Sequence, residues 1–425
     1  MNTVPHRWTL ATKALPWALL CLGLCGAAEA VRYASRPAAE PGALALALAV
    51  GASGPMLGAT SGVTTGATSG ATPGPLLAAS AAPSSPPRLA LRSASKIPMP
   101  AGVPSAHASA LVALDDGEVL AFWWAGARES GADVAIYLAR WKEGRWSEAQ
   151  RIVERGGLGR QLGFGVRRLG NPTAWVARDG RIHLYAVATG LGGWAASRIV
   201  HLVSLDRGHT FNAVRVLALS PLFNTSFLVR ANSVGLADGG WLLPAYFELG
   251  HKYPLVMAMD AQGAPLWSQR IGASTTTLQP ALLPVSSTEI HALMRDHGAQ
   301  RRLQRATSVD AGRNWRDAPA LGMVNDDSSV AAIPLAEGGF VMAHNDQLAT
   351  PATARQWLRL STSADAQTWH AALDVRRGAR GEEFSYPSLL RVGSELHVTF
   401  TELRGAIGHH VYDIVPGARV RQESP

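Results

Sequence analysis

The sequence predicts an all-β protein, a six-bladed β-propeller that occupies residues 89–425. A unit made of an apolar run, a tight turn and a second apolar run occurs six times, with successive turns about 50–60 residues apart. This spacing leaves room for one four-stranded blade per unit. A second turn motif follows several of the units, and 47% of the residues are hydrophobic, which supports a large buried core.

Each unit is a predicted antiparallel strand pair with its turn in the middle. Five of the six turns contain glycine, which accepts the positive φ that tight hairpin turns require. The units cover residues 110–124, 172–189, 232–247, 280–296, 329–345 and 387–402.

The second motif, Ser-x-Asp-x-Gly-x-x-aromatic, occurs at residues 204–211 and 308–315, with a degenerate copy at 363–369. The aspartate can accept backbone N–H bonds within its own turn, the glycine permits the bend, and the aromatic ring covers the core. The motif therefore predicts a recurring structural turn that stays in register with the six hairpins.

The first 88 residues lack the pattern of a folded domain. Arg7 and Lys13 precede an apolar run at residues 14–28, and small residues follow it, so residues 1–30 are a predicted signal peptide or N-terminal membrane anchor. The run is shorter than the ~20 residues that span a bilayer, and both interpretations stay open. Residues 31–88 are rich in Ala, Gly, Ser and Pro and predict a flexible linker.

Composition excludes several classes of protein. The formal net charge is +8, but the basic residues are scattered and form no run of the kind that binds nucleic acid. The two cysteines, Cys21 and Cys25, both lie in the N-terminal apolar run, so the propeller has no disulfide framework and no thiolate metal site. We expect no metal and no cofactor.

One rim of the propeller is expected to carry the functional site. Residues just before the first apolar run of each unit, and those just after its second apolar run, gather at this rim. The reason is that antiparallel pairing places the two ends of a hairpin side by side. These positions are mostly polar or ionisable, as in a ligand cleft, and we expect them to face solvent. The substrate-binding candidates among them are His107, Arg128, Asn171, Asn232, Gln279, Arg295, Asp327 and Asn345.

The Ser-x-Asp-x-Gly motifs are similar to Asp boxes, and with them residues 100–412 resemble the sialidase (neuraminidase) superfamily. The start of the first predicted strand, at His107, and the stretch around Tyr386 look more like those of the bacterial sialidase-like proteins with BNR repeats than like those of catalytic sialidases. The resemblance implies a six-bladed propeller, with the Asp boxes on the face opposite the active site.

Three site residues follow from this resemblance. Residues 385–389 look like the stretch that carries the tyrosine nucleophile of sialidases, which implies that Tyr386 is the nucleophile. Asp133, which precedes a strand ending in Arg140, matches their acid/base aspartate. Arg295, at the end of the fourth hairpin, matches one arginine of the triad that binds the substrate carboxylate.

Three positions depart from the sialidase pattern. His107 stands where the first arginine of the triad belongs. Gln279 stands where the glutamate partner of the nucleophile belongs, and a glutamine side chain cannot take a proton. Residues 325–329 supply no third arginine from the fifth blade. We therefore expect a single triad arginine, Arg295, and a substitute base, Glu248, at the end of the third hairpin.

These residues favour a glycoside hydrolase that acts on an anionic glycan. Asp133 would protonate the leaving oxygen, and Tyr386, or a water activated by Glu248, would attack the anomeric carbon. Arg295 and Arg128 would hold an anionic group. The substrate would be an extracytoplasmic glycan or polysaccharide. We expect an exported protein, periplasmic or extracellular, with anchoring to the inner membrane as the second option.

Two other functions stay open. The loss of the glutamate and of two arginines favours a non-catalytic, lectin-like propeller that binds carbohydrate. A polysaccharide lyase on the same fold would need a base beside a uronate, and His107 or Tyr386 could supply one. The sequence does not give the sugar, the linkage or the oligomeric state.

Overall fold

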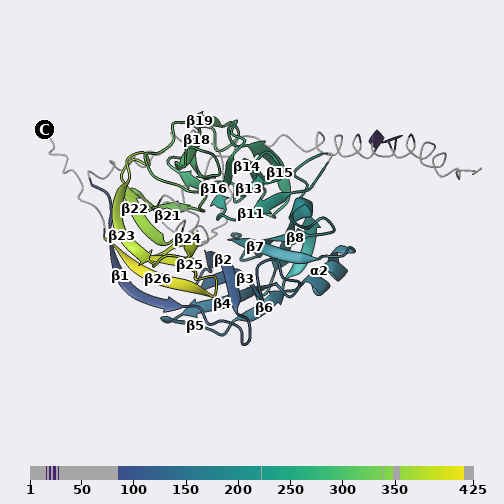
Figure 1. The fold of residues 1–425 in the computed structure, drawn as a ribbon, viewed down its shortest axis with the longest axis horizontal. Coiled ribbons are helices and arrows are strands. Elements are labelled where there is room, and N and C mark those ends of the chain that lie inside the picture. Colours follow the sequence, from purple (N-terminus) through teal and green to yellow (C-terminus); the bar gives the residue numbers. More distant parts are fainter. Residues whose placement is uncertain are drawn as a thin grey trace, which may run out of the picture.

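The protein folds as six antiparallel sheets arranged around a central axis, as the computed structural model in Figure 1 shows. The structure describes residues 85–415 except positions 222, 337 and 348–354, together with a few single positions between residues 16 and 27. In each sheet the strands run in order from the axis outward, so that the inner strands β2, β7, β11, β16 and β24 lie nearest the centre of Figure 1. The expected six-bladed β-propeller is confirmed.

Blades 1 to 3 follow one another along the chain. Their strands are β2 (Ser105–Ala113), β3 (Val119–Gly126), β4 (Ala135–Lys142), β5 (Arg145–Trp146) and β6 (Gln150–Val153); β7 (Arg168–Val176), β8 (Ile182–Thr189), β9 (Ser197–Ser204) and β10 (Asn212–Val216); β11 (Phe227–Val229), β12 (Val234–Gly235), β13 (Trp241–Phe247), β14 (Tyr253–Met259) and β15 (Pro265–Arg270). A helix, α2 (Arg155–Leu162), joins blade 1 to blade 2, and a 3₁₀ turn, η1 (Gly193–Ala196), lies between β8 and β9.

Blades 4 to 6 complete the ring. Their strands are β16 (Thr277–Pro284), β17 (Ile290–Asp296), β18 (Gln304–Ser308) and β19 (Arg316–Ala318); β20 (Ala331–Pro334), β21 (Phe340–Asn345), β22 (Trp357–Ser363) and β23 (His370–Arg377); β24 (Phe384–Val392), β25 (Glu395–Glu402), β26 (Ala406–Val415) and, from the other end of the propeller sequence, β1 (Arg88–Lys96).

Strand β1 closes the ring by adding to the outer edge of blade 6. It pairs antiparallel with β26 from Arg88 opposite Val415 to Lys96 opposite Gly408. The pairing covers the backbone groups of β26 that would otherwise form an open edge. The sequence did not reveal this role for residues 88–96, because they contain no hairpin of their own.

The core lies between adjacent blades, where apolar side chains of neighbouring sheets pack together. Trp175 of β7, for example, stacks on Trp241 of β13 with ring centroids 5.8 Å apart. Trp123 and Trp241 are among the largest side chains that are fully buried. These tryptophans therefore fill the propeller and are not available to stack on a sugar.

The three Asp boxes form the turns that the sequence predicts. In the second box the carboxylate of Asp310 accepts bonds from the backbone N–H of Asn314 (2.8 Å) and the hydroxyl of Ser308 (2.7 Å). Asp206 accepts the equivalent bonds in the first box, and Asp365 does so in the degenerate copy. All three follow the third strand of their blade, at the end away from the start of the inner strand. We call that end the turn face and the opposite one the site face.

Apart from those few single positions, the predicted signal or anchor at residues 1–30 lies outside the described residues, as does nearly all of the predicted linker at 31–88. None of the helices in the described part of the chain is long and apolar enough to cross a membrane.

Candidate functional site

The inner strands of blades 1, 4 and 6 are interrupted at the same place, close to the site face. In β2, β16 and β24 the pairing with the second strand shifts register there. Ala108, Gln279 and Tyr386 lie in these bulges with φ of 58°, 50° and 54°. Such left-handed backbone costs a non-glycine residue about 1–3 kcal/mol and occurs preferentially at functional sites. The bulges direct side chains out of the regular alternation of the strand.

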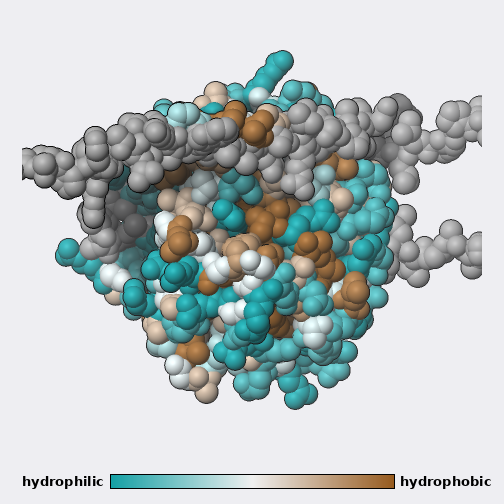
Figure 2. All heavy atoms as spheres, turned by 90° about the vertical axis from the view of Figure 1, so that its right-hand side faces the viewer, coloured by the Kyte–Doolittle hydropathy of each residue, from teal (hydrophilic) through white to brown (hydrophobic). Residues whose placement is uncertain are grey.

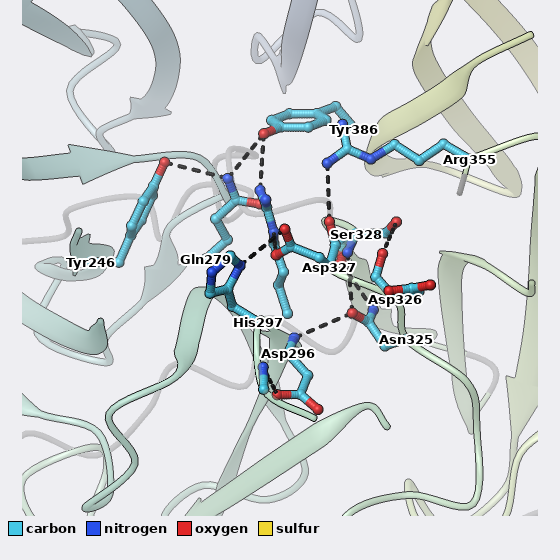
Figure 3. A network of polar contacts seen from close by, with 12 residues as sticks. Tyr246, Gln279, Asp296, His297, Asn325, Asp326, Asp327, Ser328, Arg355 and Tyr386 are labelled. Carbon is cyan, nitrogen blue, oxygen red and sulfur yellow. Dashed lines mark hydrogen bonds and ion pairs between the residues drawn. The ribbon is translucent and has the colours of Figure 1, made fainter. Parts of the chain in front are cut away.

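The hydroxyl of Tyr386 joins blade 6 to blade 4. Its oxygen accepts hydrogen bonds from Nη1 of Arg295 (3.1 Å) and from Nε2 of Gln279 (3.2 Å), both in blade 4. Figure 3 shows the Gln279 side chain reaching this oxygen. Because blades 4 and 6 are not neighbours, the contact lies at the propeller axis. Tyr386 is 9% exposed, so the expectation that it faces solvent is wrong.

Two more cations lie against the ring of Tyr386. The guanidinium carbon of Arg230 is 5.1 Å from the ring centroid, and that of Arg355 is 5.5 Å away. Burial alone would raise the pKa of Tyr386. The charges of Arg295, Arg355 and Arg230 and the hydrogen bond from Gln279 outweigh burial and lower this pKa below the ordinary value of 10.0. The surroundings of Tyr386 therefore favour its phenolate.

Arg355 and Arg230 are two arginines beside Tyr386 that the sequence analysis, which expected Arg295 as the single triad arginine, did not identify. Arg355 comes from blade 5, in the connection between β21 and β22, and donates through Nη2 to the carbonyl of Asp327 (3.0 Å). Arg230 follows β11 and donates to the carbonyls of Pro387 (2.7 Å) and Ser109 (3.3 Å), so it links the inner strands of blades 6 and 1. Burial lowers the pKa of Arg230 to about 10.

Asp327 and Glu383 balance these positive charges. Asp327 accepts from Nε of Arg295 (2.6 Å), and Glu383 accepts from Nη1 of Arg355 (3.1 Å) and Nε of Arg404 (2.8 Å). Burial alone would raise the pKa of each carboxyl, but the paired arginines lower both pKa values below their ordinary range. The pairs fix the two guanidinium groups next to Tyr386. We call His107, Arg230, Gln279, Arg295, Asp327, Arg355, Glu383 and Tyr386 the Tyr386 centre.

His107 is the neutral member of the Tyr386 centre. It is 2% exposed, and its ring centroid lies 4.0 Å from that of Tyr386. Burial, followed by the charge of Arg404 and of three arginines of the centre, holds the pKa of His107 well below its usual value. Its buried Nδ1 atom has no hydrogen-bond partner among the described residues. A polar atom in this state can bind a polar group of a ligand.

Glu248 lies beside the centre, next to the end of β13. Burial raises its pKa above the ordinary value, and among the charges that oppose this rise that of Arg295 has the largest effect. The hydroxyl of Tyr246, two residues earlier, accepts a bond from Nε2 of Gln279 (3.3 Å). Gln279 therefore connects Tyr246 to Tyr386, as Figure 3 shows.

Two predicted binding residues bond to the backbone of β24. Nδ2 of Asn232 donates to the carbonyl of Leu389 (3.0 Å), and Nδ2 of Asn345 donates to that of Phe384 (2.8 Å). Both side chains support the strand that carries Tyr386. Asn171 lies half-buried in β7, where the pairing with β8 shifts register.

Asp133 and Arg128 lie in the exposed connection between β3 and β4, on the site face. The Oδ2 atom of Asp133 accepts a hydrogen bond from the backbone N–H of Ala127 (2.6 Å), which closes the loop. Neither residue has a contact that ties it to Tyr386 within the described part of the chain. The structure thus brings together Tyr386, Gln279, Arg295, Asp327 and His107, and leaves Asp133 and Arg128 on a loop of the same face.

The comparisons with known proteins agree with this architecture. A model of the family described as "BNR repeat-like domain" matches residues 117–398. No curated protein is significantly similar in sequence to the chain.

Solved structures share the fold at low sequence identity. A Dyadobacter fermentans protein of unknown function has a TM-score of 0.62 at 12% identity, covering 77% of this chain and 99% of that one. A Trypanosoma rangeli sialidase in complex with sialic acid has a TM-score of 0.55 at 16% identity, covering 79% of this chain and 60% of that one. A Penicillium chrysogenum α-L-arabinanase complexed with arabinobiose has a TM-score of 0.55 at 12% identity, covering 77% and 98%. The family match extends over well more than half of the chain, so the protein belongs to the BNR repeat-like domain family, on a sialidase-like six-bladed propeller.

Proposed function

We propose that the protein is a glycoside hydrolase that acts on an anionic, extracytoplasmic glycan, with Tyr386 as its nucleophile. The observation that carries the proposal is the pair of donors on the Tyr386 oxygen, Nη1 of Arg295 and Nε2 of Gln279. A free tyrosine, with a pKa of about 10, is a weak nucleophile near neutral pH. Cations and hydrogen-bond donors around the oxygen favour the phenolate, which is the form that attacks.

The reaction has two steps in this proposal. In the first, the Tyr386 oxygen bonds to the anomeric carbon while the bond from that carbon to the leaving oxygen breaks, and Asp133 gives its proton to that oxygen. In the second, water attacks the glycosyl-tyrosine, Asp133 takes a proton from this water, and Tyr386 leaves as phenolate. The arginines around Tyr386 stabilise the negative charge on its oxygen whenever it is free.

Glu248 accepts the proton of Tyr386 in this proposal. Gln279 cannot accept a proton, so the proton that Tyr386 loses must go to another group. The burial that raises the pKa of Glu248 makes it a better proton acceptor than an exposed glutamate. Glu248 would also be the base for a direct attack by water.

The anionic group of the glycan would bind near the positively charged side chains of the centre. Arg295 and Arg355 each use part of their guanidinium for Asp327 and Glu383, so the substrate anion would compete for donors that are already engaged. The second candidate is a lectin-like propeller that binds glycans without turnover, and Gln279, which donates to Tyr386 and cannot take its proton, favours it. The two candidates differ in whether a covalent intermediate forms at Tyr386.

A trapping experiment separates the candidates. Native protein and the Tyr386→Phe variant would be incubated with a panel of fluorinated glycosyl fluorides that includes a sialyl and a uronyl member. In the hydrolase, the Tyr386 oxygen displaces fluoride and the intact mass rises by one glycosyl group, which peptide mapping places on Tyr386. Failure to label or hydrolyse any member of the panel, together with equal glycan binding by both proteins, would leave only the lectin-like function.

A further inference from the structure

Blade 2 and α2, the helix that packs on its outer strand β10, carry a group of arginines that the Tyr386 centre does not use. α2 supplies two of them, the segment that enters β7 supplies two, and the start of β9 supplies the last. We call this group the arginine ledge, and its members are Arg155, Arg160, Arg167, Arg168 and Arg198. All are exposed except Arg168, which is half-buried.

The five arginines of the ledge outnumber the carboxylates near them. No member forms an ion pair with a carboxylate within the part of the chain that the structure describes. Between residues 154 and 205 the sequence has two acidic residues: Glu154, which is exposed beside Arg155, and Asp179, which lies in the β7–β8 turn on the opposite face. Unpaired like charges held on one surface repel one another and attract a polyanion. Elsewhere in the propeller, surface arginines such as Arg92 and Arg207 do have carboxylate partners.

The fold fixes the arginine ledge in place. Leu158 of α2 is buried in the core, and Oε1 of Gln161 accepts a hydrogen bond from the backbone N–H of Ala213 in β10 (2.6 Å). These contacts hold α2 on blade 2 with Arg155 and Arg160 exposed. The guanidinium carbon of Arg198 lies 5.7 Å from the ring centroid of Phe164, just beyond α2.

Apolar side chains are interspersed with these arginines. Phe164 and Trp194 are partly exposed, and Leu191 is 81% exposed. Figure 2 looks onto the side of the molecule that carries β8, β15 and α2 in Figure 1, and it shows hydrophobic side chains scattered among hydrophilic ones. Aromatic and apolar groups beside cations suit a polymer of charged sugar rings, since ring faces pack on the apolar groups and acidic substituents reach the cations.

Trp194 connects the arginine ledge to the loop that carries Asp133. Its Nε1 atom donates to the hydroxyl of Ser130, three residues before Asp133 (2.7 Å). Its ring packs so closely on Gly170 of β7 that a Cβ there would lie 2.7 Å from it. The loop of the proposed acid therefore lies next to β7, the strand that begins with Arg168 of the ledge.

We propose that the arginine ledge binds the chain of an anionic polysaccharide whose scissile bond lies at the Tyr386 centre. This proposal rests on the proposed function, because it extends the substrate of that site from one sugar to a polymer. The shared chemistry of the ligand is a repeated acidic group, carboxylate or sulfate, on sugar rings. Nucleic acid and anionic lipid are other polyanions, and they are outcomes of the test.

The test compares two triple variants of the full chain. The ledge variant is R160Q/R167Q/R198Q, and the control variant, R88Q/R145Q/R316Q, removes the same charge from exposed arginines outside the ledge. Calorimetric titration would use polygalacturonate, dextran sulfate and neutral dextran at 50 and 200 mM NaCl. We expect the ledge variant to bind one of the two anionic polymers about tenfold more weakly than native protein does, with a smaller salt dependence. The control variant should stay within about twofold of native protein.

Several results would overturn the proposal. One is that the ledge variant binds the anionic polymers as tightly as native protein does. Another is that the control variant loses as much affinity as the ledge variant. The third is that native protein binds neither anionic polymer. Tighter, ledge-dependent binding of a single-stranded oligonucleotide or of phosphatidylglycerol vesicles would also overturn it in favour of that partner. Binding needs no turnover, so ledge-dependent binding by a protein that never labels at Tyr386 would keep this proposal and reject the hydrolase.

Discussion

Nη1 of Arg295 lies 3.1 Å from the hydroxyl oxygen of Tyr386, and Nε of the same guanidinium lies 2.6 Å from Asp327. The carboxylate fixes the orientation in which the arginine donates to the tyrosine. Arg295 thus supplies both a charge and a directed hydrogen bond to the proposed nucleophile.

Replacing this arginine should move the pH dependence of turnover. If the phenolate of Tyr386 attacks, activity rises with pH through the pKa of Tyr386, which Arg295 lowers. Arg295→Met removes that charge, raises the pKa of Tyr386, and should shift the rise in kcat/KM to higher pH by about 1–3 units. The measurement is kcat/KM against pH on an activated aryl glycoside, with Arg316→Met as control. An unshifted profile would show that Tyr386 does not attack as the phenolate.

Glu383 should stabilise the fold at neutral pH and lose this effect in acid. Its carboxylate holds Arg355 and Arg404, and its folded-state pKa lies below the ordinary 4.5. Such a group contributes stability above pH 4.5, and the contribution disappears as pH falls through the lowered pKa. Glu383→Gln should therefore lower the free energy of unfolding by about 1–3 kcal/mol at pH 7 and by much less at pH 3.

Urea unfolding at the two pH values measures this difference. Glu148→Gln changes an exposed glutamate and should leave the free energy of unfolding nearly unchanged at both. A deficit in Glu383→Gln that is equally large at pH 3 would mean that lost packing, not the ion pairs, destabilises the variant.

Strand β1 should be required for a stable propeller. A chain starting at residue 85 keeps β1 and should unfold cooperatively, since residues 1–84 contribute no described contact to the blades. A chain starting at residue 97 leaves the edge of β26 unpaired and should unfold at a lower temperature or aggregate. Differential scanning calorimetry and light scattering would compare the two chains. Equal melting temperatures would show that closure by β1 is dispensable.

The sequence could predict the fold because the fold repeats. Each blade needs the same hairpin and many need the same turn, so the pattern recurs with a regular period, and Asp310 and its equivalents make the bonds expected of them. The position of a residue relative to a hairpin also predicted that Tyr386, Gln279, Arg295, Asp327 and His107 meet. That inference needs only the antiparallel pairing of two strands.

The repeat pattern could not predict the roles of residues that lie outside the repeats. Arg355 reaches Tyr386 from a connection between β21 and β22 that has no periodic pattern. The burial of Tyr386 depends on the bulge and the positive φ at that residue, which apolar and polar spacing does not encode. β1 is a single strand whose partner lies over 300 residues away, so no local signal assigns it to blade 6.

The role of Asp133 can be tested by varying the leaving group of the substrate. Its Oδ2 atom accepts the N–H of Ala127, and an asparagine oxygen can accept the same bond, so Asp133→Asn should keep the loop. A proton donor matters only when the departing oxygen is basic. We therefore expect turnover of an alkyl glycoside to fall by about 10²–10⁴ and that of a dinitrophenyl glycoside to change little in the first step. Asp310→Asn, on the turn face, should affect neither substrate. Equal losses in the rate of the first step on both substrates would exclude Asp133 as the acid, because a defect in proton donation must depend on the basicity of the leaving group.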